Sequence, residues 1–396
     1  MKSKKILLTL VSIGIYLLST GISYAAFIFI DRASQGIIFT SPLPSEKEEE
    51  TPDRRALVEI TGSQTESCPL NGAKYTKTEK KIWETRRPLA VMVENHLESR
   101  NQSGLSDADI IYETVAEGGI TRFMAIFYCQ AAAYESIIGP VRSARTYFVD
   151  WASEYNFPLY VHVGGANTPG PANALGQIAD YGWSSENDLN QFSIGFPTFW
   201  RDYERLGRTV ATEHTMYSTT EKLWAVAKKR GYTNVDPEDN EWSDDFQPWQ
   251  FAKKEPDFAD RGETNHISYN FWSDYGDYQV DWEYDKENNF YNRKNGQQAQ
   301  KDFNIDKQLN AKNIVVQFAT ERSANDGYPG NLHLLYGTIG PGKALIFKDG
   351  EVIKGNWSKA NRLARTTFTD SSNKEIQFNP GAIWISVLPI GTEVNY

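Results

Sequence analysis

The N-terminal segment constrains the chain most, because it contains an uncharged run long enough to cross a membrane. Lys2, Lys4 and Lys5 precede an apolar stretch over residues 6–30. A helix that crosses a bilayer needs about 20 apolar residues, and lysines on its short side keep that side in the cytoplasm. We therefore expect a cytoplasmic tip at residues 1–5, a single-pass anchor in the cell membrane at 6–30, and an extracytoplasmic remainder.

A cleaved signal peptide is the alternative interpretation of this segment. Residues 23–25, Ser-Tyr-Ala, resemble a small-residue cleavage site. The apolar run continues through residues 27–30, beyond the core of a normal signal peptide, which favours an uncleaved anchor. Both interpretations place the bulk of the chain outside the cytoplasm.

The composition after the anchor predicts two domains. Residues 31–56 are rich in Pro and Glu, which is typical of a polar stalk. Residues 233–263 lose apolar periodicity and mix Pro with acidic residues, which predicts a linker. We expect a first domain at 57–232 and a second at 264–396, each of ordinary domain size.

Strand-like and helix-like segments alternate in the first domain. We expect strands at 88–94, 108–115, 121–128 and 158–163, and helices at 143–156, from about 172, and after Ser218. Ser218 and Glu221 have the spacing of a capping box, and Gly231 would end that helix. The alternation predicts an α/β or α+β domain with a mixed sheet.

The second domain shows a different periodicity. Apolar and polar residues alternate over 266–271 and 278–284, which predicts half-buried strands. Asp349-Gly350 is a hairpin turn signal between two further strands. We expect a mostly antiparallel β domain.

The two cysteines and the net charge indicate which compartment and which partners suit this chain. Cys68 and Cys129 would pair in an oxidising compartment, closing a loop of about 60 residues that stabilises the fold by about 4 kcal/mol. A catalytic thiol is the alternative, although Cys129 has no histidine near it in sequence. The net charge of −10, without a basic cluster beyond the tip, argues against a nucleic-acid partner.

Two glutamates and three arginines between 112 and 145 stand out as candidates for a site. They are Glu113, Glu117, Arg122, Arg142 and Arg145. Two of the arginines flank the expected start of the helix at 143, whose first turn carries no acid, and cations at that position need a counter-anion. The anion could come from the two glutamates, or from a bound phosphate or carboxylate. We expect Arg142 and Arg145 to act as clamps with Arg122 assisting, and Ser143 to cap the helix beside them.

A second junction between a strand and a helix has a similar character. His162 ends a strand, and Gly164 and Gly165 begin a loop rich in Gly and Pro whose backbone N–H groups can approach an anion. If the two strands are neighbours, both junctions open on one edge of the sheet, the usual ligand crevice of an α/β layer. An ordinary surface loop is the alternative interpretation.

Catalytic residues would come from the same region. Glu113, Glu117, His162 and His214 are the candidates for acid–base chemistry, although a histidine beside a strand is more often structural. The sequence has no zinc-pair spacing and no G-x-S-x-G motif, so we expect no metal and no cofactor. With 11 Trp and 21 Tyr, exposed rings that stack on sugars are a further hypothesis; core packing is its alternative.

Several long motifs resemble one family. These are RRPLAVMVENH (86–96), QSGLSDADIIYETVAEGGITRFMAIF (102–127), GPVRSARTYF (139–148), YVHVGG (160–165), AKNIVVQ (311–317), LIFKDGEVIKGNW (345–357) and FNPGAIWISV (378–387). They resemble the YerB-like family of bacterial proteins described as lipoproteins. The resemblance implies a membrane-attached, extracytoplasmic, two-domain protein and supplies no reaction. The apolar segment lacks the cysteine of a lipoprotein, so a helical anchor would replace the lipid.

Three hypotheses follow for the charged cluster. The leading one is an envelope protein that binds an anionic ligand, such as a cell-wall polymer or a peptide. The second is an enzyme of glycopolymer or phosphoryl transfer, or of hydrolysis, in the same cleft. The third is a structural scaffold, in which the arginines only pair with Glu113 and Glu117.

Overall fold

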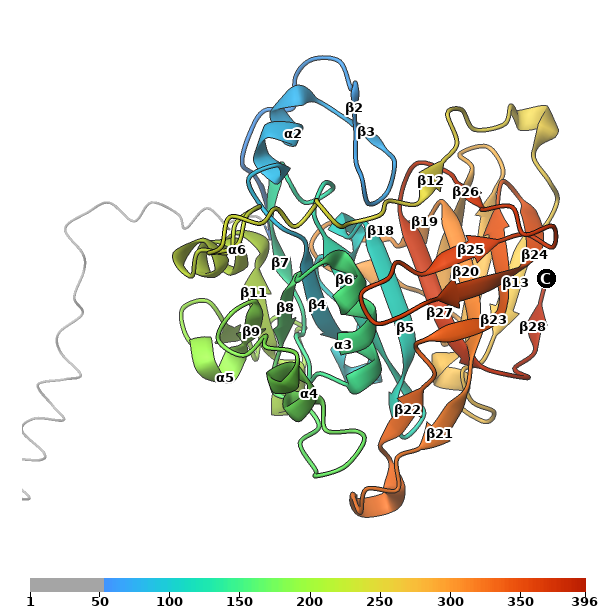
Figure 1. Cartoon of the computed structure of the whole chain (residues 1–396). Helices are drawn as coiled ribbons and strands as arrows, with labels where there is room; N and C mark the ends of the chain where they lie inside the picture. The colour runs from blue at the N-terminus through green and yellow to red at the C-terminus, as the bar shows by residue number, and fades with distance from the viewer. Residues whose placement is uncertain (1–52) are drawn as a thin grey trace, which may run out of the picture. The chain divides into compact units, whose positions relative to one another are not determined.

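A ten-stranded mixed sheet is the centre of residues 53–396, which the computed structural model describes (Figure 1). In sheet order its strands are β25 (Thr367–Thr369), β24 (Glu351–Lys359), β23 (Gly340–Lys348), β20 (Asn313–Ala319), β27 (Ile383–Pro389), β5 (Ile110–Glu117), β6 (Ile120–Phe127), β4 (Leu89–Glu94), β8 (Leu159–His162) and β9 (Asp188–Asn190). Strands β5 and β27 pair in parallel, so both halves of the chain contribute to one sheet.

The central strands form where the sequence is apolar without interruption. Strands β4, β5 and β6 are buried along almost their whole length, as expected for strands that are covered on both faces. Gly118 and Gly119 join β5 to β6 with φ of 57° and 79°, and a tight hairpin turn of this kind requires positive φ at both positions. The four strands predicted between 88 and 163 correspond to β4, β5, β6 and β8.

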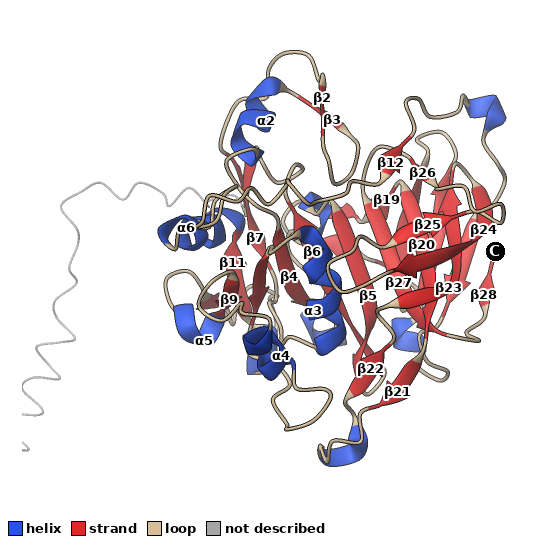
Figure 2. Cartoon of the chain, viewed as in Figure 1, coloured by secondary structure: helices blue, strands red, loops and turns tan. Residues whose placement is uncertain are grey.

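Smaller sheets surround the central one, and strands outnumber helices (Figure 2). One sheet comprises β16 (Gln298–Ala299), β15 (Phe290–Asn295), β14 (Val280–Asp285), β13 (His266–Tyr269) and β28 (Val394–Asn395), with β19 (Asn310–Ala311) paired to β15. A second comprises β1 (Arg54–Ala56), β7 (Tyr134–Ile138), β11 (Met216–Thr219) and β10 (Trp200–Arg201). Two-stranded sheets join β2 (Glu66–Ser67) to β3 (Lys74–Tyr75), β12 (Gln250–Phe251) to β26 (Gln377–Phe378), β17 (Lys301–Asp302) to β18 (Lys307–Gln308), and β21 (Glu321–Ser323) to β22 (Leu334–Tyr336).

The fold is therefore mostly β, with a mixed sheet in the first half and antiparallel sheets in the second. Asp349 and Gly350 form the predicted hairpin turn between β23 and β24, both with positive φ. Strands of the second half also make parallel contacts, β27 with β20 and with β5, and β26 with β12, beside the mostly antiparallel pairing that was predicted. The predicted linker, 233–263, contains β12, and the division of the chain at that segment stays a prediction.

The helices of the described residues are short. They are α2 (Lys77–Trp83), α3 (Thr146–Ala152), α4 (Ala174–Asp180), α5 (Gln191–Ile194) and α6 (Thr220–Lys229), with a 3₁₀ turn (Ser153–Tyr155) continuing α3. The predicted capping box at Ser218 is wrong by one residue: Thr219 caps α6 by accepting from Lys222 N, whereas the Ser218 hydroxyl donates to Thr198 O. Gly231, at φ 87°, follows the end of α6 as predicted.

Helix α3 lies against the ten-stranded sheet beside β5 and β6 (Figure 1). The Tyr147 hydroxyl donates to Val115 O, 2.8 Å away on β5, and Trp151 is buried on the same side. The prediction that Ser143 caps this helix is wrong, because α3 begins at Thr146 and Arg145 is its N-cap residue without a capping side-chain bond. The segment before α3, residues 142–145, is therefore extended chain rather than helix.

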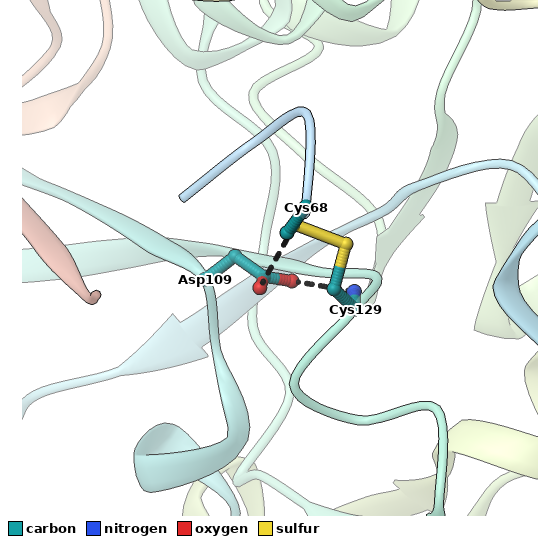
Figure 3. A group of neighbouring side chains, drawn as sticks. All are labelled: Cys68, Asp109 and Cys129. Carbon is teal, nitrogen blue, oxygen red and sulfur yellow. Dashed lines mark hydrogen bonds between the residues drawn. A yellow bond between two sulfur atoms is a disulfide. The ribbon is translucent and has the colours of Figure 1, made fainter. Parts of the chain in front are cut away.

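Cys68 and Cys129 form the predicted disulfide (Figure 3). Asp109 lies beside it and accepts hydrogen bonds from Tyr128 N at 2.7 Å and Cys129 N at 3.0 Å. Its Oδ1 also lies 3.8 Å from Cys68 Sγ, a contact and not a hydrogen bond, because a disulfide sulfur carries no proton. The bond ties the segment before α2 to the end of β6, and it removes both sulfurs from catalysis and metal binding.

The predicted tip (1–5) and anchor (6–30) lie outside the described residues, as does most of the stalk (31–56). Within residues 53–396, none of the helices has the length and apolar character needed to span a membrane.

Candidate functional site

A pocket of about 590 Å³ opens beside the carboxyl ends of β4, β8 and β9. These three strands run parallel, so the residues that follow each of them meet at one edge of the sheet. Its lining includes Arg142, Ser143, Gly164, Gly165, Asn167, Asn190, Arg201 and Glu213, with apolar walls from Val163, Leu175, Phe192 and Met216. The structure thus brings together four of the six predicted ligand-binding residues.

Arg142 is the predicted arginine that reaches this pocket, with 24% of its side chain exposed. Its Nε donates to Oε2 of Glu94, the last residue of β4. Burial alone would raise the pKa of Glu94, but the charges of Arg122 and Arg142 hold it below the ordinary value. Glu94 therefore stays ionised and fixes the guanidinium of Arg142 at the pocket wall.

The other two arginines lie behind the wall and do not clamp a ligand directly. Arg145 donates to Glu117 Oε1 at 2.6 Å and to Ala144 O at 2.7 Å. Arg122 donates to Ser143 O at 3.1 Å, and its side chain is only 2% exposed. The two residues hold the backbone of 143–144 in place, so the structure makes them positioning residues for the loop that carries Arg142.

The cluster carries more positive than negative charge. Glu117 forms ion pairs with two arginines, Arg145 at 2.6 Å and Arg122 at 3.7 Å. Glu94 pairs with Arg142. Burial, and next the neighbouring Arg145, lower the pKa of Arg122 to about 10. The buried Nε atoms of Arg122 and Arg145 have no hydrogen-bond partner among the described residues. The cluster would therefore be stabilised by an additional anion.

Glu113 does not take part, which corrects the prediction that it orients these arginines. Its carboxylate accepts from Arg293 at 2.7 Å and from Trp384 Nε1 at 3.1 Å, and its side chain is fully buried. Glu117 does pair as predicted, with Arg145 and Arg122. Burial would raise the pKa of Glu117, but the charges of these arginines outweigh it and lower the pKa.

The two predicted histidines occupy separate clusters. His162 is fully buried: Nδ1 lies 2.6 Å from Gly164 O, and Nε2 lies 2.6 Å from Asp188 Oδ1. Both ring nitrogens are thus engaged in holding the glycine loop against β9, which leaves neither for acid–base chemistry. His214 lies instead beside Glu94, with Nδ1 3.7 Å from Oε2.

A second pocket of about 440 Å³ lies over α6. Arg86 and Glu221 line it and form a two-point ion pair at 2.7 and 3.0 Å. Because these charges already satisfy each other, this pocket offers an ionic ligand less than the pocket at Arg142.

Sequence reasoning missed several residues of the site. Glu94 follows an apolar strand directly, and polar residues at the end of a buried strand are a signal that could have found it. Asn190, Arg201 and Glu213 reach the pocket from segments with no motif, so their participation depends on the long-range fold.

Comparisons with known proteins agree with this architecture. Residues 72–233 match the family model described as "Protein of unknown function (DUF3048) N-terminal domain", and residues 267–385 match the corresponding C-terminal domain. The chain belongs to the DUF3048 family. The resemblance to YerB-like proteins inferred from the motifs is thereby confirmed.

A relative with a solved structure supports the same conclusion. The Bacillus subtilis (strain 168) protein named "Putative lipoprotein YerB" is 32% identical over 329 residues, which cover 81% of this chain and 86% of the relative. The crystal structure of the YerB protein from Bacillus subtilis matches with a TM-score of 0.66 and 26% identity, over 84% of this chain and 100% of that chain. The family description assigns no function.

Proposed function

We propose that this protein is a membrane-anchored, extracytoplasmic protein of the cell envelope that binds an anionic ligand in the pocket beside Arg142. The lipoprotein name of the Bacillus subtilis relative supports the location. The lysine-flanked apolar run at 6–30 supports a single-pass helical anchor in place of a lipid. The disulfide between Cys68 and Cys129 suits an oxidising compartment.

One observation carries the ligand proposal: a partly exposed arginine lines a pocket whose surrounding cluster has more guanidinium groups than carboxylates. Arg142 presents its free N–H groups to the pocket, and guanidinium groups recognise phosphates and carboxylates through paired hydrogen bonds. The backbone at Ser143, Gly164 and Gly165 forms the adjacent wall. Phosphates of a wall polymer and carboxylates of a peptide are the matching ligand classes.

The enzymatic alternative has less support, because three of the four predicted acid–base residues are already held by other groups. Glu113 and His162 are fully buried with their polar atoms paired, and Glu117 is held by Arg145. The scaffold alternative would make Arg142 purely structural. Replacing Arg142 distinguishes the two: a purely structural role predicts a large loss of stability, whereas ligand binding predicts a loss of anion affinity.

Isothermal titration calorimetry tests the proposal on the full chain in detergent. The probes are inorganic pyrophosphate, a muropeptide with free carboxylates, and a polyprenyl phosphate. We expect at least one to bind, and Arg142→Ala to weaken it by roughly 10-fold or more, since a hydrogen bond to a charged group is worth about 1.5–3 kcal/mol. Arg55→Ala is the control, because Arg55 is an exposed arginine paired with Glu135 on another sheet.

Two results would contradict the proposal. One is the absence of binding by all three probes at millimolar concentration. The other is binding that Arg142→Ala leaves at the parent affinity. The location is tested separately by adding protease to intact protoplasts, where cleavage beyond residue 56 from outside is expected and full protection would exclude it.

A further inference from the structure

His96 and Glu98 meet His214, which is distant from them in sequence, beside Glu94. His96 precedes the 3₁₀ helix η1 (Leu97–Ser99), and His214 ends the 3₁₀ helix η4 (Thr212–His214). Their rings stack with centroids 4.5 Å apart. Glu98 Oε2 lies 3.8 Å from His214 Nε2. Ligand atoms of His96, Glu98 and His214 all lie within 4.8 Å of one another.

We propose that His96, Glu98 and His214 form a binding site for a divalent transition-metal ion of the Zn²⁺ type. Two imidazoles and one carboxylate are a ligand set that binds zinc and leaves a fourth position for water or a ligand. Zinc would place these ligand atoms about 3.4 Å apart, so the groups must move inward by about 1 Å. The His96 ring must also rotate out of its stack on His214, because the lone pair of an imidazole nitrogen lies in the ring plane and the two planes are only 10° from parallel. Glu98 is half exposed and His96 is partly exposed, so both side chains can make this movement.

Glu94 supplies the supporting carboxylate that metal-binding histidines usually have. Its Oε2 lies 3.7 Å from His214 Nδ1, and that buried nitrogen has no hydrogen-bond partner among the described residues. The tautomer that offers a proton from Nδ1 to Glu94 leaves the Nε2 lone pair facing Glu98. A carboxylate behind the ring in this manner fixes the orientation of a histidine ligand.

Hydrogen bonds fix the backbone and the carboxylates around the proposed ligands. Glu94 Oε1 accepts from His96 N at 3.2 Å, and Glu98 Oε2 accepts from Ala211 N at 3.2 Å. The first bond fixes the start of η1 and the second holds η1 against the start of η4, so the site is partly built before a metal arrives.

His96 changes its contacts when it coordinates. Its Nδ1 accepts from Glu98 N at 3.2 Å, and metal binding through either ring nitrogen exchanges this bond for coordination. The exchange is made at a partly exposed position, where water can satisfy the Glu98 amide. Neither the spacing of the histidines nor any motif predicts this site, because its two halves come from segments far apart in the chain.

Metal titration of the full chain, in detergent and without a histidine tag, tests this inference independently of the anion pocket. After treatment with a chelator, we expect one Zn²⁺ to bind per chain by isothermal titration calorimetry. His96→Ala and Glu98→Gln should each weaken binding by roughly 10-fold or more. His266→Ala is the matched control: it is an exposed histidine that faces Asp281 at 2.9 Å on another sheet, and it should leave binding unchanged.

A second measurement separates coordination from loose association. Co²⁺ should give visible absorption bands with the parent protein that are lost in His96→Ala and retained in His266→Ala, while thermal unfolding confirms that the variants are folded. Mg²⁺ should not compete, since it prefers oxygen ligands. The proposal is overturned if Zn²⁺ does not bind, if His96→Ala and Glu98→Gln bind as the parent does, or if Mg²⁺ displaces Zn²⁺.

Discussion

Glu113 and Glu94 occupy strands on either side of β6, and each pairs with an arginine, but their surroundings differ. Glu113 and Arg293 are both fully buried. The Arg293 guanidinium stacks over Trp384 at 4.2 Å and donates to Gln300 at 2.7 Å. Glu113 also accepts from Thr121 at 2.9 Å. We call this the closed pair, because aromatic rings and polar partners enclose both charges.

Glu94 and Arg142 form the open pair. Glu94 is buried, whereas Arg142 keeps 24% of its side chain exposed in the pocket wall. Two further arginines lie nearby and share a single carboxylate, that of Glu117. The closed pair balances its charges internally, but the open pair belongs to a cluster with one positive charge in excess.

The comparison shows that a buried ion pair by itself does not indicate a binding site. Access to solvent and an excess of one charge are the features that do. A closed pair mainly imposes a penalty if one partner is lost, because the other is left uncompensated in a dry environment. An open pair can exchange water for a ligand. The sequence presents both pairs alike, as single charges among apolar runs, so experiments must distinguish them.

Breaking the closed pair should have the largest effect on stability. Glu113→Ala leaves Arg293 buried without its counter-charge, and we expect a loss of about 3–5 kcal/mol in the free energy of unfolding. Urea titration followed by tryptophan fluorescence measures it. The double replacement Glu113→Leu with Arg293→Met should recover a large part of the loss, since it removes the uncompensated charge. A single variant as stable as the parent would show that the pair is not closed.

Acid provides a second test, on another enclosed cluster. Burial would raise the pKa of Glu154, but the charges of Lys359 and Arg365 outweigh it and lower the pKa to about 2 from the ordinary 4.5. The folded state therefore binds fewer protons than the unfolded state between these values. Its stability contribution is present above pH 4.5 and is lost as the pH falls toward 2, a loss of about 3 kcal/mol.

Unfolding midpoints measured from neutral pH down to about pH 2.5 check this expectation. Glu154→Gln should flatten the profile relative to the parent. Glu283→Gln, which removes a half-exposed carboxylate paired with Lys294, should not change its slope. Equal slopes for the parent and Glu154→Gln would mean that the cluster around Glu154 is accessible to water.

Local sequence patterns predicted the strands well, but only some of the partners of the charges: Glu117 pairs with Arg145 and Arg122 as expected, and Glu113 does not. The apolar runs of β4, β5 and β6 and the turn at Asp349 follow from chemistry within a few residues. The Ser218 error shows the limit even there: Ser218 and Thr219 are adjacent hydroxyls, and only the contact of Ser218 with Thr198 O decides which one caps α6.

The pairing of Glu113 with Arg293 could not be predicted, because it depends on how the β14–β15 sheet packs on the central one. The same reason hid the role of His214, which needs η1 and η4 to meet. The loop at Gly164 was found because it directly follows β8, a parallel strand of the central sheet, so local order and spatial order coincide there. Arg142 follows β7, which belongs to another sheet, and reaches the same edge because its backbone N–H donates to Met92 O on β4 at 2.9 Å. Glu94 has the same signal and could have been found with it.

Removing the arginine of the open pair, Glu94–Arg142, should reduce stability less than breaking the closed pair. Arg142→Ala leaves Glu94 with the charge of Arg122 and with pocket water, so we expect a loss of about 1–2 kcal/mol in the free energy of unfolding. Anion affinity should fall at the same time. A loss as large as that of Glu113→Ala would instead favour a purely structural role for Arg142.

The smallest effect on stability is expected at the pocket rim. Arg201 lines the pocket and is exposed, and its Nη1 donates to Thr212 O at 2.5 Å and to Thr215 Oγ1 at 3.3 Å. Arg201→Ala should change the free energy of unfolding by less than about 0.5 kcal/mol. If the pocket attracts anions, the variant should still bind the anionic probe several-fold more weakly, with a shallower dependence of affinity on salt, because an exposed cation contributes through screened attraction. Titrations of Arg201→Ala and Arg55→Ala at low and high salt measure this difference. Equal affinity of both variants for the anionic probe would mean that the ligand does not contact this rim. Arg142 would then be the arginine of the pocket that binds it.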